Sequence, residues 1–205
     1  MPDPARGYSS ATLVEAAKAA IDIDPAIRAT WQGARLIGPA FPVQGAGGDN
    51  LALHLAVAAA PRGSVLVVDA GGAAYGHWGE VLTVAAQQRG IAGLLIDGGI
   101  RDTSEIQQLG FPVFARSAAI RGTRKDFPGV LGRAVTVGGV VVSEGDLIVG
   151  DDDGAVALPT ATVPAVLDAA DARVAQEQEY FARLRAGERT LDLYGFGAPY
   201  RGDRG

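Results

Sequence analysis

The feature that most constrains the fold is a short apolar run, Ile91–Ile96, that is followed at once by charged residues. Its length and its apolar character indicate a strand buried in an α/β sheet. The next residues, Asp97–Gly99, predict a turn that ends the strand, because glycine adopts backbone angles that are closed to other residues. Arg101 and Asp102 come directly after that turn.

Arg101 and Asp102 are the predicted centre of an active site. An arginine can hold a carboxylate through two parallel hydrogen bonds, and an aspartate can ligate a divalent metal ion. Ligands of open α/β sheets bind at the carboxyl ends of the strands, which is where this pair is expected. The structural alternative is that both residues only cap the helix expected from about Thr103, since Asp, Ser and Thr all suit a helix cap.

Composition limits the classes of function. The 205 residues are 48% hydrophobic and 20% charged, which is typical of a globular protein. The net charge is −5 and no basic stripe is present, so nucleic acid is not an expected partner. The lack of cysteine excludes disulfides and cysteine-ligated zinc. We see no signal segment and no membrane-spanning run, and therefore expect a cytoplasmic protein without a membrane partner.

The chain is predicted to form one domain over residues 1–205, because no shift in composition marks a linker. We expect N-terminal helices over 9–33, a core over about 35–160, and a C-terminal helix with a tail over 160–205. The core should hold a mixed sheet with helices on its faces. The fold class is therefore α/β.

Particular segments support this plan. Two helices are expected in the N-terminal part, over Thr12–Ala20 and Pro25–Gln32, the second with its proline in the first turn, where proline is tolerated. Glu80–Arg89 is expected to be a helix that Gly90 ends. The β-branched segments Gly132–Val142 and Asp146–Leu158 are interrupted by glycines and turn residues, which indicates antiparallel hairpins.

A third charged residue is predicted to join the Arg-Asp pair. Twenty residues separate Glu80 from Arg101, and they include one helix and one strand. Consecutive parallel strands usually lie side by side, so the loops that follow them should meet at one edge of the sheet. Glu80, Arg101 and Asp102 would then surround one pocket at a helix N-terminus, which favours anions. The alternative for Glu80 is an ordinary acidic residue in a first helical turn.

These residue types suit the chemistry of small carboxylates. Arg101 would hold a carboxylate or an enolate, and Asp102 would hold a divalent cation such as Mg²⁺ or Mn²⁺. Glu80 would orient or deprotonate a metal-bound water. With only His54 and His77 in the chain, a His-rich zinc site is not expected. A structural or interface role is favoured for His54, and less strongly a structural role for His77, which adjoins the candidate loop.

Several other motifs do not match. The glycine loop Gly45–Asn50 lacks the Gly-Lys-Ser/Thr ending of a P-loop. The glycines of Val67–Gly76 do not have dinucleotide-binding spacing. Lys125 stands between Arg124 and Asp126, which indicates a solvated loop and argues against a Schiff-base lysine.

Glu80, twenty residues and then Arg101-Asp102 match the signature of a known family. The chain resembles the metal-dependent pyruvate aldolases that cleave 4-hydroxy-4-methyl-2-oxoglutarate and 4-carboxy-4-hydroxy-2-oxoadipate. It also resembles their non-aldolase relative, the regulator of ribonuclease E activity A. The likeness covers roughly residues 35–160. It includes three further segments, Gly48–Leu51, Pro112–Ala115 and Gly145–Gly154.

The resemblance implies a fold and an assembly. The fold would be the β/β/α swivelling type, and the chain would form a homotrimer or a dimer of trimers. The site would lie between subunits, and a glutamate from a neighbour's C-terminal region would take part. Glu177 is the candidate for this glutamate and Glu179 is the alternative.

The resemblance also implies how ligands bind. Asp102 would hold Mg²⁺ (or Mn²⁺), which chelates a small 2-keto acid. Arg101 and backbone N–H groups would bind the same end of the substrate. These N–H groups are those around Gly79, Glu80, Val81 and Leu82.

The implied activity is that of a carbon–carbon lyase. A class II pyruvate aldolase would cleave 4-hydroxy-2-keto diacids to pyruvate, and would decarboxylate oxaloacetate because loss of CO₂ gives the same enolate. Characterised aldolases often carry Asp at the position of Glu80, so the longer acid bears on rate and substrate preference. The regulators tend to lack an acid there, which favours the enzyme. The alternative is a non-catalytic protein-binding regulator of the ribonuclease E inhibitor type.

Overall fold

Four parallel strands form the centre of the sheet. The computed structural model describes residues 7–196. The central strands are β2 (Leu36–Gln44), β3 (Val65–Asp69), β4 (Gly93–Ile100) and β5 (Val113–Ala118). They run parallel and lie in the order β5-β4-β3-β2. Both faces of β3 and β4 are buried, which explains why their sequences are apolar runs without alternation.

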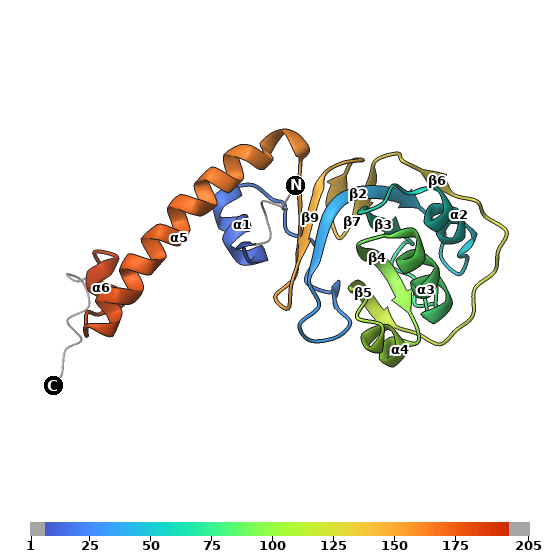
Figure 1. The fold of residues 1–205 in the computed structure, drawn as a ribbon, viewed down its shortest axis with the longest axis horizontal. Helices are drawn as coiled ribbons and strands as arrows, with labels where there is room; N and C mark the ends of the chain where they lie inside the picture. The colour runs from blue at the N-terminus through green and yellow to red at the C-terminus, as the bar shows by residue number, and fades with distance from the viewer. Residues whose placement is uncertain (1–6, 197–205) are drawn as a thin grey trace.

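Three helices connect these strands and cover one face of the sheet (Figure 1). They are α2 (Leu51–Ala59), α3 (Glu80–Arg89) and α4 (Thr103–Gln108). Each helix returns the chain to the edge where the strands begin, so the loops that follow the strands meet at the opposite edge. At that edge Asp69 of β3 lies opposite Asp97 of β4. The predicted meeting of these loops is confirmed.

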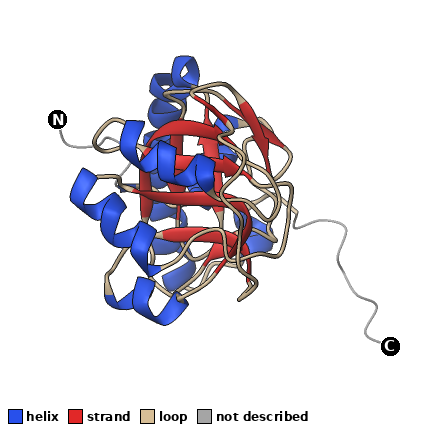
Figure 2. Ribbon diagram, turned by 90° about the vertical axis from the view of Figure 1, so that its right-hand side faces the viewer, coloured by secondary structure: helices blue, strands red, loops and turns tan. Residues whose placement is uncertain are grey.

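Antiparallel strands extend the sheet on both sides. β1 (Arg28–Ala29) pairs with β5, and β9 (Leu147–Gly150) pairs with the first half of β2 while β3 pairs with its second half. The remaining strands are β10 (Ala155–Leu158), β6 (Val130–Leu131) and the hairpin β7 (Val135–Val137) and β8 (Val140–Val142). The hairpin packs on the face of the sheet that α2 and α3 leave open. Figure 2 shows the helices outside the strands of the sheet.

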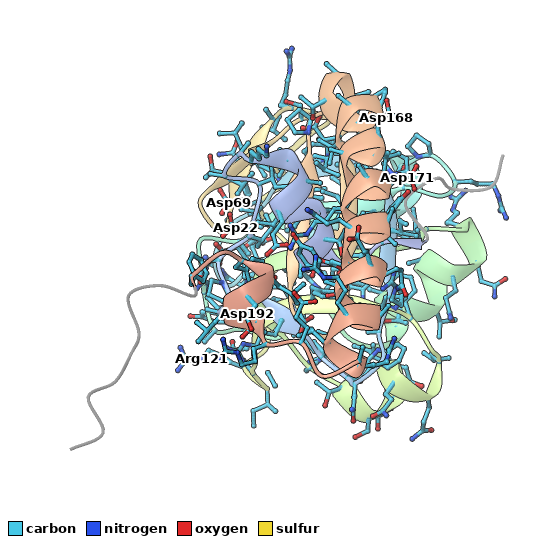
Figure 3. All side chains as sticks on the ribbon, turned by 90° about the vertical axis from the view of Figure 1, so that its left-hand side faces the viewer. Asp22, Asp69, Arg121, Asp168, Asp171 and Asp192 are labelled. Atoms are coloured by element: carbon cyan, nitrogen blue, oxygen red, sulfur yellow. The ribbon has the colours of Figure 1, made fainter. Side chains whose placement is uncertain are left out.

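Helices α1 (Ser10–Ala17) and α5 (Val163–Arg185) pack together at the far end of the sheet, beside β10 (Figure 1). A short 3-10 helix, η2 (Thr160–Thr162), precedes α5. Only Val166 and Ala170 of α5 are buried. The rest of the helix runs away from the sheet and leads to α6 (Thr190–Leu193). Figure 3 shows α5 lengthwise, with Asp168 and Asp171 along it.

The predicted fold class is confirmed: the protein is α/β, with a mixed, nearly closed sheet, flanking helices and a C-terminal helix. Both predicted hairpins are also present, as β7–β8 and β9–β10. Among residues 7–196, no helix is long and apolar enough to cross a membrane.

The predicted helix over Pro25–Gln32 is wrong. Arg28 and Ala29 instead form β1, and the N–H of Thr30 donates to the carbonyl of Val113 at 2.9 Å. This segment lies beside β5, whose outer edge has backbone N–H and C=O groups that need hydrogen-bond partners. A strand can pair with these groups, and a helix cannot. Pairing with the edge strand therefore outweighs local helix propensity.

The predicted turn at Asp97–Gly99 is also wrong, because β4 continues through it to Ile100. The pairing with β5 shifts register between Ile96 and Gly99, as at a β-bulge. The glycines are needed for close approach: a Cβ on Gly99 would lie 2.7 Å from the carbonyl oxygen of Tyr75. The strand thus carries Arg101 farther along the sheet than the sequence predicts.

A charged cluster fixes the carboxyl end of β4. Arg116 of β5 binds Asp97 through Nε (2.5 Å) and Nη2 (3.1 Å), and its Nη1 lies 2.9 Å from Asp24. The N–H of Gly138, in the β7–β8 turn, donates to Asp97 at 3.3 Å. Arg116 therefore holds the N-terminal segment against the sheet and Asp97 holds the hairpin, and Arg101 takes no part in this network.

Candidate active site

Asp102 links the end of β4 to the start of α3. Its carboxylate Oδ2 accepts a hydrogen bond from the backbone N–H of Glu80 at 3.0 Å. Its side chain does not cap α4, the helix that it precedes. The structural alternative, in which Asp102 only caps its own helix, is therefore wrong. The carboxylate instead lies at the positive end of α3, where a negative charge is stabilised.

The backbone of Asp102 has an uncommon conformation. Its φ of 56° places it in the left-handed region, which it shares with Lys18 alone among the non-glycine residues of 7–196. Aspartate tolerates this region better than most residues, and such conformations are frequent at functional sites. The conformation turns the chain out of β4 and directs the Asp102 carboxylate toward α3.

Arg101 lies beside Asp102 with its head group half exposed. Its Nε is 3.6 Å from Oδ2 of Asp102, and its backbone N–H donates to the carbonyl of Trp78 at 2.8 Å. Trp78 is fully buried, stacks on Phe111, and donates through Nε1 to Thr83 of α3 at 2.7 Å. The buried tryptophan thereby fixes the backbone of Arg101 against the N-terminus of α3.

Two glycines make room for the arginine. A Cβ on Gly76 would lie 2.9 Å from Cδ of Arg101, and a Cβ on Gly79 would collide with the carboxylate of Asp102. Gly79 itself is extended and precedes α3. The glycines of this loop therefore allow Arg101 and Asp102 to pack closely against its backbone. This packing role agrees with the observation that the loop matches no nucleotide-binding motif.

Two hollows adjoin Arg101. One, of about 230 Å³, is lined by the start of α3 (Gly79, Val81 and Leu82) together with Lys125. The other, of about 570 Å³, is lined by Asp102 and the segment that follows β5. No acceptor in residues 7–196 is found for the backbone N–H groups of Val81 and Leu82. Arg101 and these N–H groups together form an anion-binding arrangement.

The structure tests the grouping of the three predicted charged residues. Arg101 and Asp102 are in contact, and Glu80 joins them through its backbone N–H. The Glu80 side chain is exposed and makes no hydrogen bond or ion pair with the described part of the chain. Only its backbone therefore joins the pair, and Glu80 is not among the residues that line the two hollows.

Glu177 and Glu179 are not near this site within one chain. The Glu177 carboxylate pairs with Arg173 at 3.0 Å, and Glu179 lies 3.8 Å from Arg183. Both belong to α5, which lies across the sheet from α3 (Figure 1). A contribution from either glutamate requires a second copy of the chain.

The residues present fit a metal that keeps most of its water. Both contacts of Asp102 use Oδ2, so Oδ1 accepts nothing from the described residues. No group of three His, Cys, Asp or Glu residues that could hold a metal occurs in 7–196. Mg²⁺ commonly takes one or two carboxylates and completes its shell with water and substrate oxygens. A single free carboxylate oxygen suits this ion and would not satisfy zinc.

His77 is a structural residue. It is completely buried, Nδ1 lies 3.1 Å from the carbonyl of Gly99, and Nε2 accepts from the N–H of Gly48 at 3.0 Å. Burial lowers the pKa of His77, so the ring is neutral near pH 7. The imidazole joins the loop of Gly48 to the end of β4. The structural role that the sequence favours is confirmed.

Asp49 holds the loop that borders the smaller hollow. Oδ1 accepts from the N–H of Leu51 at 3.0 Å and Oδ2 from the N–H of Asp126 at 2.7 Å. Burial raises the pKa of Asp49, but the N–H of Asp126, other backbone N–H groups and Arg124 more than offset it, so the pKa lies below its usual range. The loop is therefore fixed by a buried, charged carboxylate.

Because the folded-state pKa of Asp49 is lowered, its stabilisation is complete above the unfolded value of about 3.9 and is lost as the pH falls through the folded value. Asp49→Asn should lower the free energy of unfolding at pH 7 by roughly 1–3 kcal/mol. It should also reduce the loss of stability between about pH 5 and pH 2. Urea unfolding across this range measures both effects. Asp153→Asn, at an exposed position, is the control, and equal curves for the two variants would contradict the role of Asp49.

Some residues of the site were not predicted. Lys125 is exposed, as the predicted solvated loop implies, but it also lines the hollow beside Arg101, which the sequence does not indicate. Trp78 carries no local signal of a role, and Asn50 is marked only by its place in the segment Gly48–Leu51. Asn50 donates through Nδ2 to the carbonyl of His77 at 3.0 Å, and its Oδ1 is buried without a partner in 7–196. These positions depend on loops that meet only in the folded chain.

The fold and the candidate site define a class: an α/β protein in which one arginine and one aspartate at the edge of the sheet meet a helix N-terminus. The chain belongs to the RraA-like family (Aldolase/RraA), whose model matches residues 10–157. This confirms the resemblance drawn from the Glu80 and Arg101-Asp102 pattern.

Individual relatives are consistent with membership of this family. A protein of Halalkalibacterium halodurans named "Putative 4-hydroxy-4-methyl-2-oxoglutarate aldolase" is 39% identical over 153 residues, which are 74% of this chain and 71% of the relative. The structure of an uncharacterized protein from Pseudomonas syringae pv. tomato has a TM-score of 0.82 at 26% identity, over 93% and 90% of the two chains. RraAS2 of Streptomyces coelicolor, described as an unusual member of the RNase ES inhibitor RraA family, has a TM-score of 0.76 at 30% identity, over 89% and 96%.

Proposed function

We propose that the protein is a divalent-metal-dependent pyruvate aldolase that cleaves 4-hydroxy-2-keto diacids and also decarboxylates oxaloacetate. The observation that carries the proposal is the junction of β4 and α3. There the Arg101 guanidinium, the free N–H groups at the start of α3 and an unengaged oxygen of Asp102 lie around adjoining hollows. The aldolase name of the Halalkalibacterium halodurans relative supports the same chemistry.

Arg101 binds and orients the keto-acid end of the substrate. Its planar guanidinium can donate to the carboxylate and to the 2-keto oxygen at once. The N–H groups of Val81 and Leu82 point from the positive end of α3 toward the same group. As the bond between C3 and C4 breaks, negative charge moves onto the keto oxygen, and these fixed donors stabilise the pyruvate enolate.

Asp102 would hold Mg²⁺ or Mn²⁺ through Oδ1 while Oδ2 stays on the N–H of Glu80. When bound, the metal supplies Lewis-acid polarisation of the keto group. The contact with Glu80 keeps the carboxylate oriented, because the backbone of α3 cannot move without breaking that hydrogen bond.

Glu80 is the group proposed to move protons. Its exposed carboxylate can take the proton of the C4 hydroxyl through a water molecule, so that the C4 oxygen forms a carbonyl as the carbon–carbon bond breaks. The same proton can then return through water to C3 of the enolate, which gives pyruvate. Oxaloacetate releases CO₂ where the aldol substrate releases a carbonyl compound. It has no C4 hydroxyl proton to remove, so it needs only the protonation of the enolate at C3.

The proposed assembly is a homotrimer or a dimer of trimers in which α5 of one copy reaches the site of another. The second half of α5 supports this arrangement, because it runs away from the sheet (Figure 1) and has no buried residue. Glu177 is the proposed donated residue, with Glu179 as the alternative.

Wild-type protein should release pyruvate from oxaloacetate and from 4-hydroxy-4-methyl-2-oxoglutarate when Mg²⁺ or Mn²⁺ is present. Treatment with EDTA should remove the activity, and added metal should restore it, because the polarised keto group is needed for the enolate. A coupled lactate dehydrogenase assay measures pyruvate, with metal but no protein as the control for spontaneous decarboxylation.

Activity that survives EDTA would contradict the metal dependence. A folded, Mg²⁺-supplied protein with no activity on either substrate would instead favour the alternative function, a protein-binding regulator like the RraA proteins that share the fold.

A further inference from the structure

The hollow of about 230 Å³ beside Arg101 has a chemical character of its own. It is smaller than the roughly 300–1,000 Å³ pockets that hold drug-sized ligands, so its ligand is small. Arg101, Lys125 and the imidazole of His54 all line it, and none of its lining residues is acidic. A hollow that gathers cations and no carboxylate favours an anionic ligand.

The two cations and the imidazole come from separate parts of the chain. Arg101 follows β4, His54 lies on α2, and Lys125 belongs to the loop between β5 and β6. Lys125 has no ion pair within 7–196, whereas the adjacent Arg124 lies 3.9 Å from the Asp126 carboxylate. No acidic side chain within 7–196 therefore neutralises the charge of Lys125.

The backbone that carries Lys125 is held firmly. The N–H of Arg124 donates to the carbonyl of Gly48 at 2.8 Å, and the N–H of Asn50 donates to the carbonyl of Arg124 at 3.0 Å. On the other side, the N–H of Asp126 is bound by the buried carboxylate of Asp49. A cation mounted on a fixed segment loses less freedom on binding than one on a loose loop, which favours a specific site.

His54 faces Lys125. Partial burial and the charge of Lys125 lower the pKa of His54, so its ring is neutral near pH 7 and offers one N–H donor. Next to it, Oδ1 of Asn50 is buried without a partner in the described residues. A ligand hydroxyl, or a water beside it, would be a suitable donor to that oxygen.

We propose that Lys125, assisted by His54, binds the carboxylate on C4 of the substrate and selects 4-hydroxy-2-keto diacids over monoacids. This inference rests on the proposed function, in which Arg101 holds the keto-acid end. Arg101, Val81 and Leu82, which hold that end, line the same hollow as Lys125, so the distal end of a substrate held there lies near Lys125. The two carboxylates of a diacid then meet separate cations.

The test compares two substrates that differ only at the distal end. 4-Hydroxy-2-oxoglutarate carries a carboxylate on C4, and 4-hydroxy-2-oxopentanoate carries a methyl group there. In Lys125→Met, the ratio of kcat/KM for the diacid to that for the monoacid should fall roughly 10- to 100-fold, which is the effect of losing a charged hydrogen bond. Lys125→Arg should restore most of the ratio. Arg124→Met, at the adjacent exposed cation, should leave it unchanged.

The outcomes separate the two proposals. An active wild type whose ratio is the same in Lys125→Met would overturn the distal site alone, as would an equal loss on both substrates. A wild type that cleaves neither compound would overturn the proposed function and this inference with it. Exchange of the pyruvate methyl protons with deuterium, followed by NMR, shows whether the enolate chemistry persists in each variant, since pyruvate has no distal carboxylate.

Discussion

Arg101→Met is expected to lower kcat/KM for pyruvate formation by about 10²- to 10³-fold or more, with the fold intact. Removing a single preorganised donor to a developing oxyanion typically costs a factor of this size, and Arg101 carries a full charge as well. Its side chain is 48% exposed and its contact with Asp102 is 3.6 Å long. Such surface pairs contribute only about 0–1 kcal/mol to stability. The loss should therefore appear in catalysis and not in the unfolding curve.

Arg101→Lys refines this experiment. Lysine keeps the positive charge but lacks the planar fork that donates to a carboxylate and a keto oxygen together. We expect activity between that of the wild type and of Arg101→Met, with most of the loss in kcat. Steady-state kinetics with oxaloacetate as substrate measure the loss of activity. Unfolding in urea measures whether stability is unchanged. An Arg101→Met protein that keeps activity within a few-fold of wild type would exclude Arg101 from the reaction.

Asp102→Asn is expected to abolish metal-dependent activity and to weaken Mg²⁺ and Mn²⁺ binding by at least about tenfold. The substitution removes the charge that holds the cation. It keeps two structural properties: asparagine tolerates the left-handed φ of 56°, and its side-chain oxygen can still accept from the N–H of Glu80. The structure of the junction should therefore persist while the ligand is lost.

Binding of Mn²⁺, measured by electron paramagnetic resonance, tests this directly and does not depend on turnover. Asp102→Ala is the matched comparison, since it also removes the cap on α3, and it should cost about 1 kcal/mol more stability than Asp102→Asn. Normal Mn²⁺ binding in Asp102→Asn would assign the metal to other residues.

Much of the framework follows from local sequence. The apolar runs before Asp69 and Asp97 are long enough for buried strands and too short for helices, and both are strands. Glu80–Arg89 is a helix with the predicted bounds, because Gly90 supplies the left-handed cap that ends it. The contact of Arg101 and Asp102 with the start of α3 follows from one rule, that consecutive parallel strands present their following loops at one edge.

The tertiary structure decided what local propensity does not encode. Arg28 and Ala29 form a strand because the edge of β5 is there to pair with them. The segment Asp97–Gly99 stays in β4 because Asp97 pairs with Asp69 of β3 and Gly99 pairs with Ser117 of β5. Likewise, Lys125 is exposed as predicted, but its position beside the hollow depends on Asp49, far away in sequence, which binds the backbone N–H of the next residue. The sequence by itself determined the central strands, the helix of Glu80–Arg89 and the Arg101-Asp102 pair, since these depend on short-range patterns. The walls of the site depend on hydrogen bonds and packing between distant segments, which only the folded chain brings together.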